Sequence, residues 1–402
     1  MGEWLRAGLF RRTTATGVLA ATALAGSLAG CTAQAAAGGT GSGHGTAGAT
    51  ASRPPAAEIS VDPAPDSAAV RLDKQVSVRV SGGRLTAVSL TPEGRAQLAG
   101  DMASDASSWQ ATGRLRAGTR YTLVVTATGP DGGTATTTSV FSTLTPKKRI
   151  RATVLPGDGW TVGVGMPVIV HFDRAVTKRE AVQDALSVTT TPAVEGAWRW
   201  QSGTEVQWRP KDYWPSGTKV RVAARLSGVE AAKGVWGTTS TSSDFAIGSA
   251  MISTVDVSRH TLTVRRNSTV IRTIPVTTGK SGFETRNGIK VIISRETSRR
   301  MDAATTGTDP KDPNYYNVVV RYAMRLTWSG EFLHAAPWSV AAQGHANVSH
   351  GCTGMSTANA LWLFQHSKVG DVVIYRNSSR PLEWGNGYTA WDMPFSTWSS
   401  AD

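Results

Sequence analysis

The chain has 402 residues, of which 18 % are charged, and it carries a formal net charge of +13 with a pI of about 10.1. Its length permits two or three domains with cores of their own, and its 42 glycines and 14 tryptophans favour β-rich modules over helical bundles. The basic residues are scattered rather than gathered in a Lys/Arg block with interleaved aromatic residues, so we expect no nucleic-acid partner. The excess positive charge suits anionic polymers or lipid headgroups, or it serves solubility alone.

The first 31 residues have the pattern of an export signal. Arg11 and Arg12 lie in a positive segment, residues 17–28 are apolar and small, and Leu28-Ala29-Gly30-Cys31 is similar to the lipobox of bacterial lipoproteins. The apolar run is too short to predict a membrane span. We therefore expect Cys31 to become the N-terminus and to carry acyl chains that anchor the protein to the outer face of the cell membrane. A twin-arginine signal, or ordinary cleavage beside an incidental cysteine, are the alternatives.

Two similar segments follow a predicted flexible linker at residues 32–55, which is rich in Ala, Gly, Thr and Ser. Residues 56–146 and 147–249 each contain short alternating strands between Gly/Pro turns, and they repeat with a period of roughly 99 residues. This pattern predicts two immunoglobulin-like β-sandwiches. Neither contains a cluster of titratable residues, so we interpret them as spacers or binding modules and expect His171 to pack rather than to react.

A third segment begins at residue 250 and again opens with strands. Residues 252–276 predict a β-meander, residues 358–364 have apolar residues at helical spacing, and residues 370–375 predict a closing strand. We therefore expect a third, β-rich domain with a short helix at residues 250–376. The fold class predicted for the whole chain is mainly β. The tail at 377–402 contains three tryptophans, which predict that it packs on this preceding domain; carbohydrate stacking is the alternative.

The residues that carry chemistry lie close together in the third domain. Once Cys31 is acylated, Cys352 is the only free thiol of the mature protein; a disulfide between the two cysteines is the alternative. A thiol with its ordinary pKa is mostly protonated at neutral pH, so a nucleophilic cysteine needs a base, and His334 reaches it if its strand runs beside the cysteine loop. Gly351 and Gly354 let the backbone turn sharply and present N–H groups to an oxyanion. Such a pair suits acyl transfer through a thioester.

Two other interpretations of this stretch stay open. His334, His345, His350 and Cys352 are all competent zinc ligands, although their spacing matches no common zinc pattern and no second cysteine is available. Cys352 could also be a buried structural cysteine with incidental histidines. We expect neither a metal nor a cofactor.

The order of these residues resembles a known signature. His334, a gap, and then Ser349-His350-Gly351-Cys352 are similar to the catalytic domain of YkuD-type L,D-transpeptidases, over residues 250–402. With a lipoprotein signal, two immunoglobulin-like domains and a Trp-rich tail, the whole layout resembles the actinobacterial members.

This resemblance implies a role for each matching residue. Cys352 would be the nucleophile and His334 the general base. His350 would line the same site and help to place the acceptor amine. The backbone N–H groups of Gly351 and Cys352 would form the oxyanion hole.

The resemblance also implies substrate-binding residues around the nucleophile. Tyr316 falls on a segment, from about Arg299 to Arg325, that would form a flap over the site. Met301 and Trp338 fall at pocket-lining positions, and Ser349 and Gly354 flank the nucleophile. Without the resemblance, Tyr316 and Trp338 could simply pack.

Three positions depart from the family pattern. Gly354 stands where the family commonly has Asn, Ala335 where a Ser follows the base, and Thr285-Arg286-Asn287-Gly288 where Thr-Pro-x-Gly is usual. Ala335 can substitute if the serine acts through its carbonyl oxygen. Of the three departures, Gly354 is the one most expected to alter substrate placement, because it lacks the side-chain amide of the asparagine that the family commonly has.

The implied function is peptidoglycan cross-linking outside the cytoplasm. A tetrapeptide stem would acylate Cys352 with release of D-Ala, and the side-chain amine of a diamino acid in a second stem would resolve the thioester. Carbapenems would acylate the same cysteine, and we expect a monomer. An L,D-carboxypeptidase with the same acyl-enzyme and a non-catalytic wall-binding lipoprotein are the alternative functions.

Overall fold

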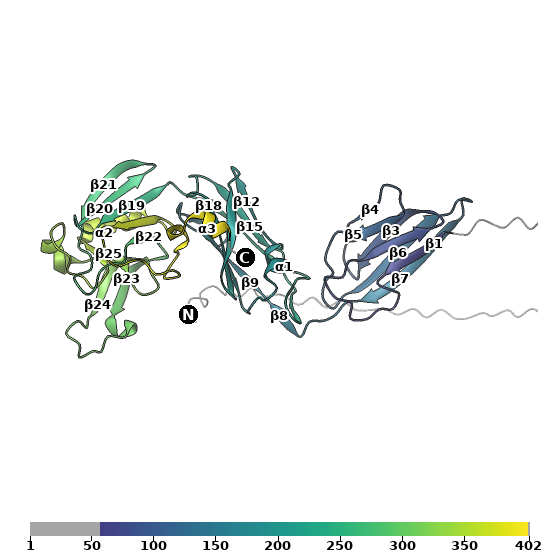
Figure 1. Cartoon of the computed structure of the whole chain (residues 1–402), viewed down its shortest axis with the longest axis horizontal. Helices are drawn as coiled ribbons and strands as arrows, with labels where there is room; N and C mark the ends of the chain where they lie inside the picture. Colours follow the sequence, from purple (N-terminus) through teal and green to yellow (C-terminus); the bar gives the residue numbers. More distant parts are fainter. Residues whose placement is uncertain (1–56, 401–402) are drawn as a thin grey trace, which may run out of the picture. The chain divides into compact units, whose positions relative to one another are not determined.

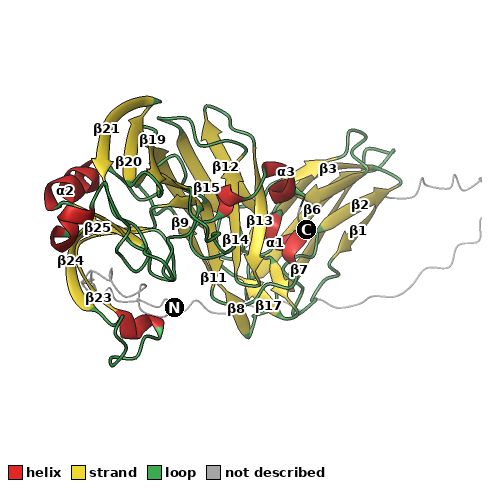
Figure 2. Cartoon of the chain, turned by 60° about the vertical axis from the view of Figure 1, so that its left-hand side comes forward, coloured by secondary structure: helices red, strands yellow, loops and turns green. Residues whose placement is uncertain are grey.

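The computed structural model describes residues 57–400, so the predicted export signal, Cys31 and the linker at 32–55 lie outside the described residues. Strands dominate the described part, and helices are few and short (Figure 2). The mainly β fold predicted from the sequence is confirmed. None of the helices in residues 57–400 has the length and apolar character needed to cross a membrane.

The first sandwich consists of two antiparallel sheets (Figure 1). One sheet has the order β1-β2-β5-β4 and the other the order β3-β6-β7. The strands are β1 (Glu58–Asp62), β2 (Ser77–Ser81), β3 (Arg84–Pro92), β4 (Gly100–Met102), β5 (Ser108–Ala111), β6 (Arg120–Thr128) and β7 (Thr134–Ser142). Strand β6 alternates between buried and outward residues, which gives one apolar face to the core. Tyr121 stacks on Phe141 in that core, and its hydroxyl accepts from the Arg116 N–H at 2.8 Å.

The second sandwich is built in the same way from two four-stranded sheets. Their orders are β13-β14-β11-β9 and β10-β18-β15-β12, and a small third sheet has the order β16-β17-β8. The elements are β8 (Lys148–Ile150), β9 (Ala152–Leu155), β10 (Thr161–Val162), β11 (Val168–Phe172), α1 (Arg179–Gln183), β12 (Leu186–Thr191), β13 (Gly196–Ser202), β14 (Glu205–Pro210), β15 (Lys219–Ala224), β16 (Glu230–Ala232), β17 (Val235–Gly237) and β18 (Thr241–Ile247). His171 on β11 is exposed to solvent, so the expectation that it packs is wrong: it takes the one outward position of that strand.

The third domain contains two sheets that enclose a common core with one helix. The five-stranded sheet has the order β21-β20-β19-β27-β22, and the four-stranded sheet has the order β23-β24-β25-β26. Its strands are β19 (Met251–Asp256), β20 (Thr261–Arg266), β21 (Thr269–Pro275), β22 (Gly288–Val291), β23 (Ser294–Asp302), β24 (Asn317–Arg325), β25 (Phe332–Ala335), β26 (Thr353–Met355) and β27 (Val372–Arg376). The core between them is aliphatic, with Leu262, Ile274, Leu333 and Leu363 fully buried.

Short helices and one hairpin complete this domain. Helix α2 (Thr357–His366) is capped by the Ser356 hydroxyl, which accepts from the Asn359 N–H, and it includes the predicted helical stretch. The predicted flap is the β23–β24 hairpin, with its connecting loop at residues 303–316 and the 3₁₀ turn η1 (Ala303–Thr306). A second 3₁₀ turn, η2 (Pro337–Ala342), follows β25.

The C-terminal tail contacts both the third domain and the second sandwich. It contains η3 (Ala390–Asp392) and α3 (Phe395–Ser399). The Asp392 carboxylate accepts from the Ile289 N–H of the third domain. The indole N–H groups of Trp391 and Trp398, however, donate to the carbonyl oxygens of Gly165 and Ala197 in the second sandwich. This second surface was not predicted, because single tryptophans do not identify which neighbour they pack on.

Candidate active site

Parallel pairing of β25 with β26 brings His334 next to the cysteine loop. Leu333 pairs with Thr353 and His334 pairs with Gly354, so Cys352 directly precedes the strand that runs beside the histidine. Because paired residues of neighbouring strands share a face, His334 and Gly354 lie on the same side of the sheet, two residues along the chain from Cys352. The register thus places the strand of the histidine beside the cysteine loop, as the sequence predicted.

The orientation of His334 is fixed by a backbone carbonyl. Its ring is buried, and its Nδ1 lies 2.8 Å from the carbonyl oxygen of Ala335. A carbonyl oxygen only accepts, so Nδ1 carries the proton and Nε2 keeps its lone pair. Burial lowers the pKa of His334, which keeps the ring neutral and able to take a proton. This bond uses the carbonyl of residue 335 and not its side chain, which is why alanine serves at this position.

The side chain of Cys352 is protonated in this arrangement. Burial raises its pKa to about 12, and the carboxylate of Glu331 also raises it, whereas the backbone of Phe332 and the cations Lys290 and Arg325 lower it. The Sγ atom donates to the carbonyl oxygen of Gly330 at 3.6 Å. A reaction at this sulfur therefore requires a base that removes the proton and neighbours that stabilise the resulting anion.

The loop before Cys352 is tied by its own side chains. The Ser349 hydroxyl donates to the Cys352 carbonyl at 2.6 Å and accepts from the Gly351 N–H at 3.1 Å. Gly351 has a φ of +116°, which side-chain-bearing residues rarely adopt. Because its N–H is already bonded to Ser349, Gly351 does not supply the free oxyanion donor that was predicted. The Cys352 N–H, by contrast, has no hydrogen-bond partner among residues 57–400.

His350 lies between aromatic rings and not against the sulfur. Its ring centroid is 4.7 Å from that of Phe283 and 5.1 Å from that of Tyr316. Burial lowers its pKa, and the nearby Lys280 ammonium lowers it further. Its Nε2 is buried without a hydrogen-bond partner in the described part of the chain. The arrangement leaves one ring nitrogen available to a substrate group.

The other predicted substrate-binding residues contact either the cysteine or the histidine. Met301 and Tyr316, from the two ends of the flap loop, join a small apolar cluster that includes Cys352. Trp338 lies near His334, with the two ring centroids 6.1 Å apart, and 60 % of its surface is exposed. Gly354 is tightly enclosed, since a Cβ atom there would lie 2.8 Å from the Ala336 Cβ. An asparagine at 354 would require a neighbouring backbone to shift.

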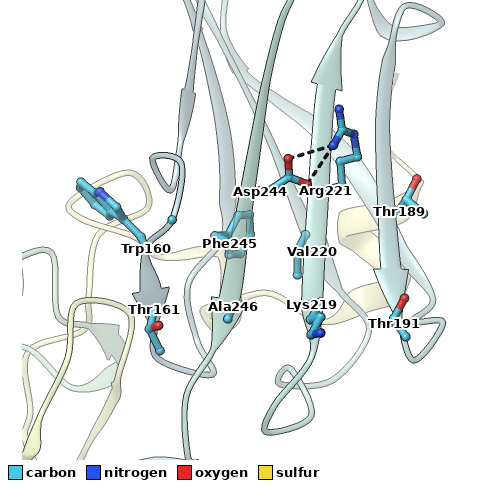
Figure 3. A pocket seen from close by; sticks show the side chains of 11 residues that line it. Trp160, Thr161, Thr189, Thr191, Lys219, Val220, Arg221, Asp244, Phe245 and Ala246 are labelled. Atoms are coloured by element: carbon cyan, nitrogen blue, oxygen red, sulfur yellow. Dashed lines mark hydrogen bonds and ion pairs between the residues drawn. The ribbon is translucent and has the colours of Figure 1, made fainter.

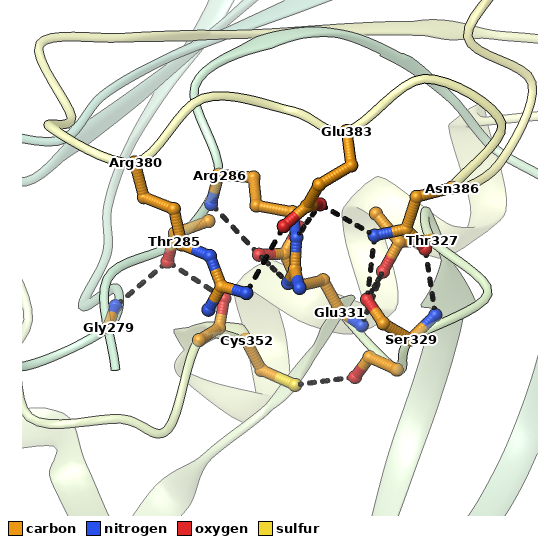
Figure 4. A network of polar contacts seen from close by, with 12 residues as sticks. Gly279, Thr285, Arg286, Thr327, Ser329, Glu331, Cys352, Arg380, Glu383 and Asn386 are labelled. Carbon is orange, nitrogen blue, oxygen red and sulfur yellow. Dashed lines mark hydrogen bonds and ion pairs between the residues drawn. The ribbon is translucent and has the colours of Figure 1, made fainter. Parts of the chain in front are cut away.

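Three charged residues next to this site were not predicted from the sequence. Lys290 and Glu331 are almost fully buried and form an ion pair, with Nζ and Oε2 2.5 Å apart. Arg286 binds the other carboxylate oxygen, and Figure 4 draws Arg286 and Glu331 in the same view as Cys352. A lone lysine in a short strand and a glutamate at a strand start resemble solvent-facing positions, so no sequence signal identified them.

Among residues 57–400, no three His, Cys, Asp or Glu side chains are grouped closely enough to hold a metal ion. A shallow groove of about 390 Å³ lies on the second sandwich, beside Trp160, Lys219 and the Arg221–Asp244 ion pair (Figure 3). It contains none of the predicted catalytic or substrate-binding residues.

Comparisons with known proteins agree with this geometry. The family described as "L,D-transpeptidase catalytic domain" matches residues 250–374, and the family "Bacterial Ig domain" matches residues 67–230. The chain is 39 % identical to L,D-transpeptidase 2 of Mycobacterium tuberculosis over 334 residues, which cover 83 % of this chain and 82 % of that protein. It is 39 % identical to L,D-transpeptidase 1 of the same species over 222 residues, covering 55 % of this chain and 83 % of that protein. The solved structure of LD transpeptidase LdtMt1 in complex with imipenem superposes with a TM-score of 0.50 at 37 % identity, covering 57 % of this chain and all of that one.

Proposed function

The chain belongs to the L,D-transpeptidase family, and from that membership we propose that it cross-links peptidoglycan stem peptides with Cys352 as nucleophile and His334 as general base. The observation that supports these roles is the pairing of His334 with Gly354, together with the bond from His334 Nδ1 to the Ala335 carbonyl. The first sets the strand of His334 beside the strand that Cys352 directly precedes, and the second leaves Nε2 as the basic atom of the imidazole.

Acylation of Cys352 is the first step of this proposal. His334 Nε2 takes the proton of Sγ, and the sulfur attacks the carbonyl carbon between the diamino-acid residue and terminal D-Ala of a tetrapeptide stem. The Cys352 N–H, which has no partner among residues 57–400, is the donor that best suits the oxyanion. The C–N bond then breaks, the imidazolium gives its proton to the leaving amine, and D-Ala departs from a thioester.

Transfer to the second stem reverses the proton movements. The side-chain amine of a diamino acid attacks the thioester carbonyl, and neutral His334 takes a proton from that amine. The C–S bond breaks, and the thiolate recovers a proton from the imidazolium. His350, with its unpaired Nε2 beside Tyr316, is the group we assign to placing the acceptor amine. Met301, Trp338, Ser349 and Gly354 complete the substrate-binding surface in this proposal.

Product analysis tests this function directly. The soluble chain from residue 56 to 402 is incubated with a purified disaccharide-tetrapeptide, and the products are identified by mass spectrometry. We expect free D-Ala and a cross-linked dimer, both absent with Cys352→Ala and both retained with Ser400→Ala, a matched substitution of an exposed residue in the tail. Tripeptide without dimer would indicate an L,D-carboxypeptidase. No product, with wall binding retained, would indicate a binding protein.

Acylation by a carbapenem offers a second readout of the same nucleophile. A relative of this chain was solved in complex with imipenem. We expect the intact protein to gain the mass of one imipenem, located on the Cys352 peptide. An adduct on any other residue would contradict the assigned nucleophile.

Placement outside the cytoplasm completes the proposal, because stem peptides are found there. We further propose that Cys31, which lies outside the described residues, is acylated and anchors the chain to the membrane. The mature protein should then carry a lipid on an N-terminal Cys31, detected by mass spectrometry of the N-terminal peptide. Release of a Cys31→Ala variant into the medium would agree with this anchor, and continued membrane retention would contradict it.

A further inference from the structure

A buried ion cluster lies behind the peptide that carries Cys352. The side chains of Lys290 and Glu331 are only 1 % and 5 % exposed. The second oxygen of Glu331 accepts from the backbone N–H of Arg286 at 2.9 Å and from its guanidinium at 3.1 Å. Lysine and glutamate are almost never buried unless paired, and removal of both from water is costly. A well-packed apolar pair would serve stability as well, so the cluster calls for another reason.

The cluster contacts the nucleophile's backbone from two directions. A Cβ atom on Gly351 would lie 3.9 Å from the Glu331 carboxylate, so this carboxylate packs directly against the residue before Cys352. Thr285, the neighbour of Arg286, donates from its hydroxyl to the Gly351 carbonyl at 2.8 Å. In the other direction, Glu331 directly follows Gly330, whose carbonyl oxygen accepts from the Cys352 thiol. Figure 4 draws the Thr285, Glu331 and Cys352 side chains of this network from close by.

The cations of the cluster offset the charge of Glu331. Lys290 and Arg286 both bind this carboxylate, and Arg286 also binds the half-exposed Glu383. The carboxylate of Glu331 raises the pKa of Cys352 and Lys290 lowers it, so loss of Lys290 would leave the anion uncompensated beside the sulfur. Charges buried on one side of a sulfur act on it through a medium of low polarity, where their effect exceeds that of surface charges. The described charged and titratable groups that interact electrostatically with Cys352 are Glu331, Lys290, Arg325, Tyr316 and Tyr375. Arg286 binds Glu331, and His334 lies on the strand paired with the one that follows Cys352.

We propose that Lys290 is a positioning residue for the reaction: its ammonium group, locked against Glu331 behind the Gly351–Cys352 peptide, stabilises the Cys352 thiolate when His334 takes the thiol proton. This inference rests on the proposed function, since it concerns the same sulfur. The role of Glu331 is to hold the lysine in place and protonated. Burial lowers the pKa of Lys290 to about 8, while Glu331 raises it, so the ammonium form prevails at neutral pH.

Alkylation of Cys352 by iodoacetamide tests the proposal, because its rate follows the fraction of thiolate. Residues 57–400 belong to one compact unit, so the chain from residue 56 can be used, with the Cys352 peptide quantified by mass spectrometry. We expect Lys290→Met to react about tenfold more slowly than wild type at pH 7, which corresponds to about one unit in the thiol pKa. The difference should narrow as pH rises through about 8, because wild-type Lys290 then loses its own charge.

Matched variants separate this charge effect from damage to the fold. Arg376→Met removes an exposed cation from β27 of the same sheet and should react like wild type. Adding Glu331→Gln to Lys290→Met removes the uncompensated anion and should restore most of the rate. Damage to the fold exposes the thiol and speeds alkylation, which is the opposite sign. If Lys290→Met does not fold, Lys290→Gln, which keeps a donor to Glu331, carries the same expectation.

Each outcome bears on one proposal. A folded Lys290 variant that reacts as fast as wild type, or a tenfold loss that persists unchanged at pH 10, would overturn the role of Lys290. In that case, intact formation of the cross-linked dimer by wild type would leave the proposed function standing. If the wild-type protein makes neither dimer nor tripeptide but shows the expected alkylation pattern, the proposed transpeptidase function would be overturned. The effect of Lys290 on the Cys352 thiolate would then still stand.

Discussion

Two buried cations, Arg209 in the second sandwich and Lys290 in the third domain, are stabilised in different ways. Arg209 is 2 % exposed and lies over the rings of Trp391, Phe395 and Trp398, at 4.8 to 5.2 Å from their centroids. It donates to carbonyl oxygens, including that of Met393 at 2.8 Å. Lys290 instead faces a carboxylate, and its Nζ lies 3.8 Å from the centroid of the Tyr375 ring.

The difference shows that a buried charge does not by itself mark a catalytic site. The three rings around Arg209 and the Met393 carbonyl belong to the C-terminal tail and hold it to the second sandwich, so this cation serves packing. Burial lowers the pKa of Arg209 to about 10, which still leaves it charged at neutral pH. Lys290 differs because the carboxylate that fixes it also packs against Gly351, the residue before Cys352.

The largest effect on activity is expected for substitution of the proposed base, His334, and not of either cation. His334→Gln should lower kcat for dimer formation by about 10² to 10⁴-fold, because an amide cannot take the thiol proton. Steady-state kinetics with the disaccharide-tetrapeptide measures this loss. The kcat of Lys290→Met for dimer formation is measured in the same assay. If His334→Gln lowered kcat less than Lys290→Met does, the roles proposed for His334 and Lys290 would be contradicted.

Arg209→Met should reduce stability without affecting the sulfur. Loss of the guanidinium leaves several carbonyl oxygens without a donor and removes the contacts with three rings, which we expect to cost about 2–4 kcal/mol. A lower thermal midpoint with an unchanged rate of Cys352 alkylation would sharpen the contrast with Lys290. A slower alkylation in the folded variant would remove that contrast.

Glu230, a buried anion of the second sandwich, extends the comparison to acid pH. It binds Lys178 and Arg71 and accepts from the Gly234 N–H, and these partners lower its pKa to about 2 although burial alone would raise it. Since the folded pKa lies below the unfolded value of 4.5, its contribution to stability is present above pH 4.5 and is lost as pH falls towards 2. Because both cations are half exposed, we expect about 1–2 kcal/mol.

The measurement for Glu230 is a series of thermal melts between pH 7 and pH 2. Glu230→Gln should melt at a lower temperature than wild type at pH 7, and the two midpoints should converge as the pH falls below 4.5. A constant difference between the midpoints at every pH would show that the charge of Glu230 is not the stabilising element.

The smallest effect is expected for Ala335→Ser. The carbonyl oxygen of residue 335, and not its side chain, orients His334, so the added hydroxyl should change kcat by about twofold or less. Kinetics of dimer formation over a range of pH checks this. A gain of tenfold or more would mean that a hydroxyl at this position assists the base in a way that the carbonyl does not.

Local sequence patterns were sufficient to predict the β-rich fold and the family. Alternating strands and turn residues depend on local spacing, and the run from Ser349 to Cys352 with His334 upstream is specific enough to identify the family. The orientation of His334 could be anticipated because a carbonyl oxygen is present whatever the side chain at 335.

Which charges are buried, and what the tail contacts, depend on the packing of distant segments. Lys290 and Glu331 are far apart in sequence, and each resembles an exposed residue of a strand edge until β22 and the start of β25 are packed together. The Gly351 N–H is consumed by a bond to Ser349, which depends on the turn and not on the motif. Burial and long-range pairing arise from the whole fold, since the free energy of a buried charge depends on neighbours that local sequence does not specify.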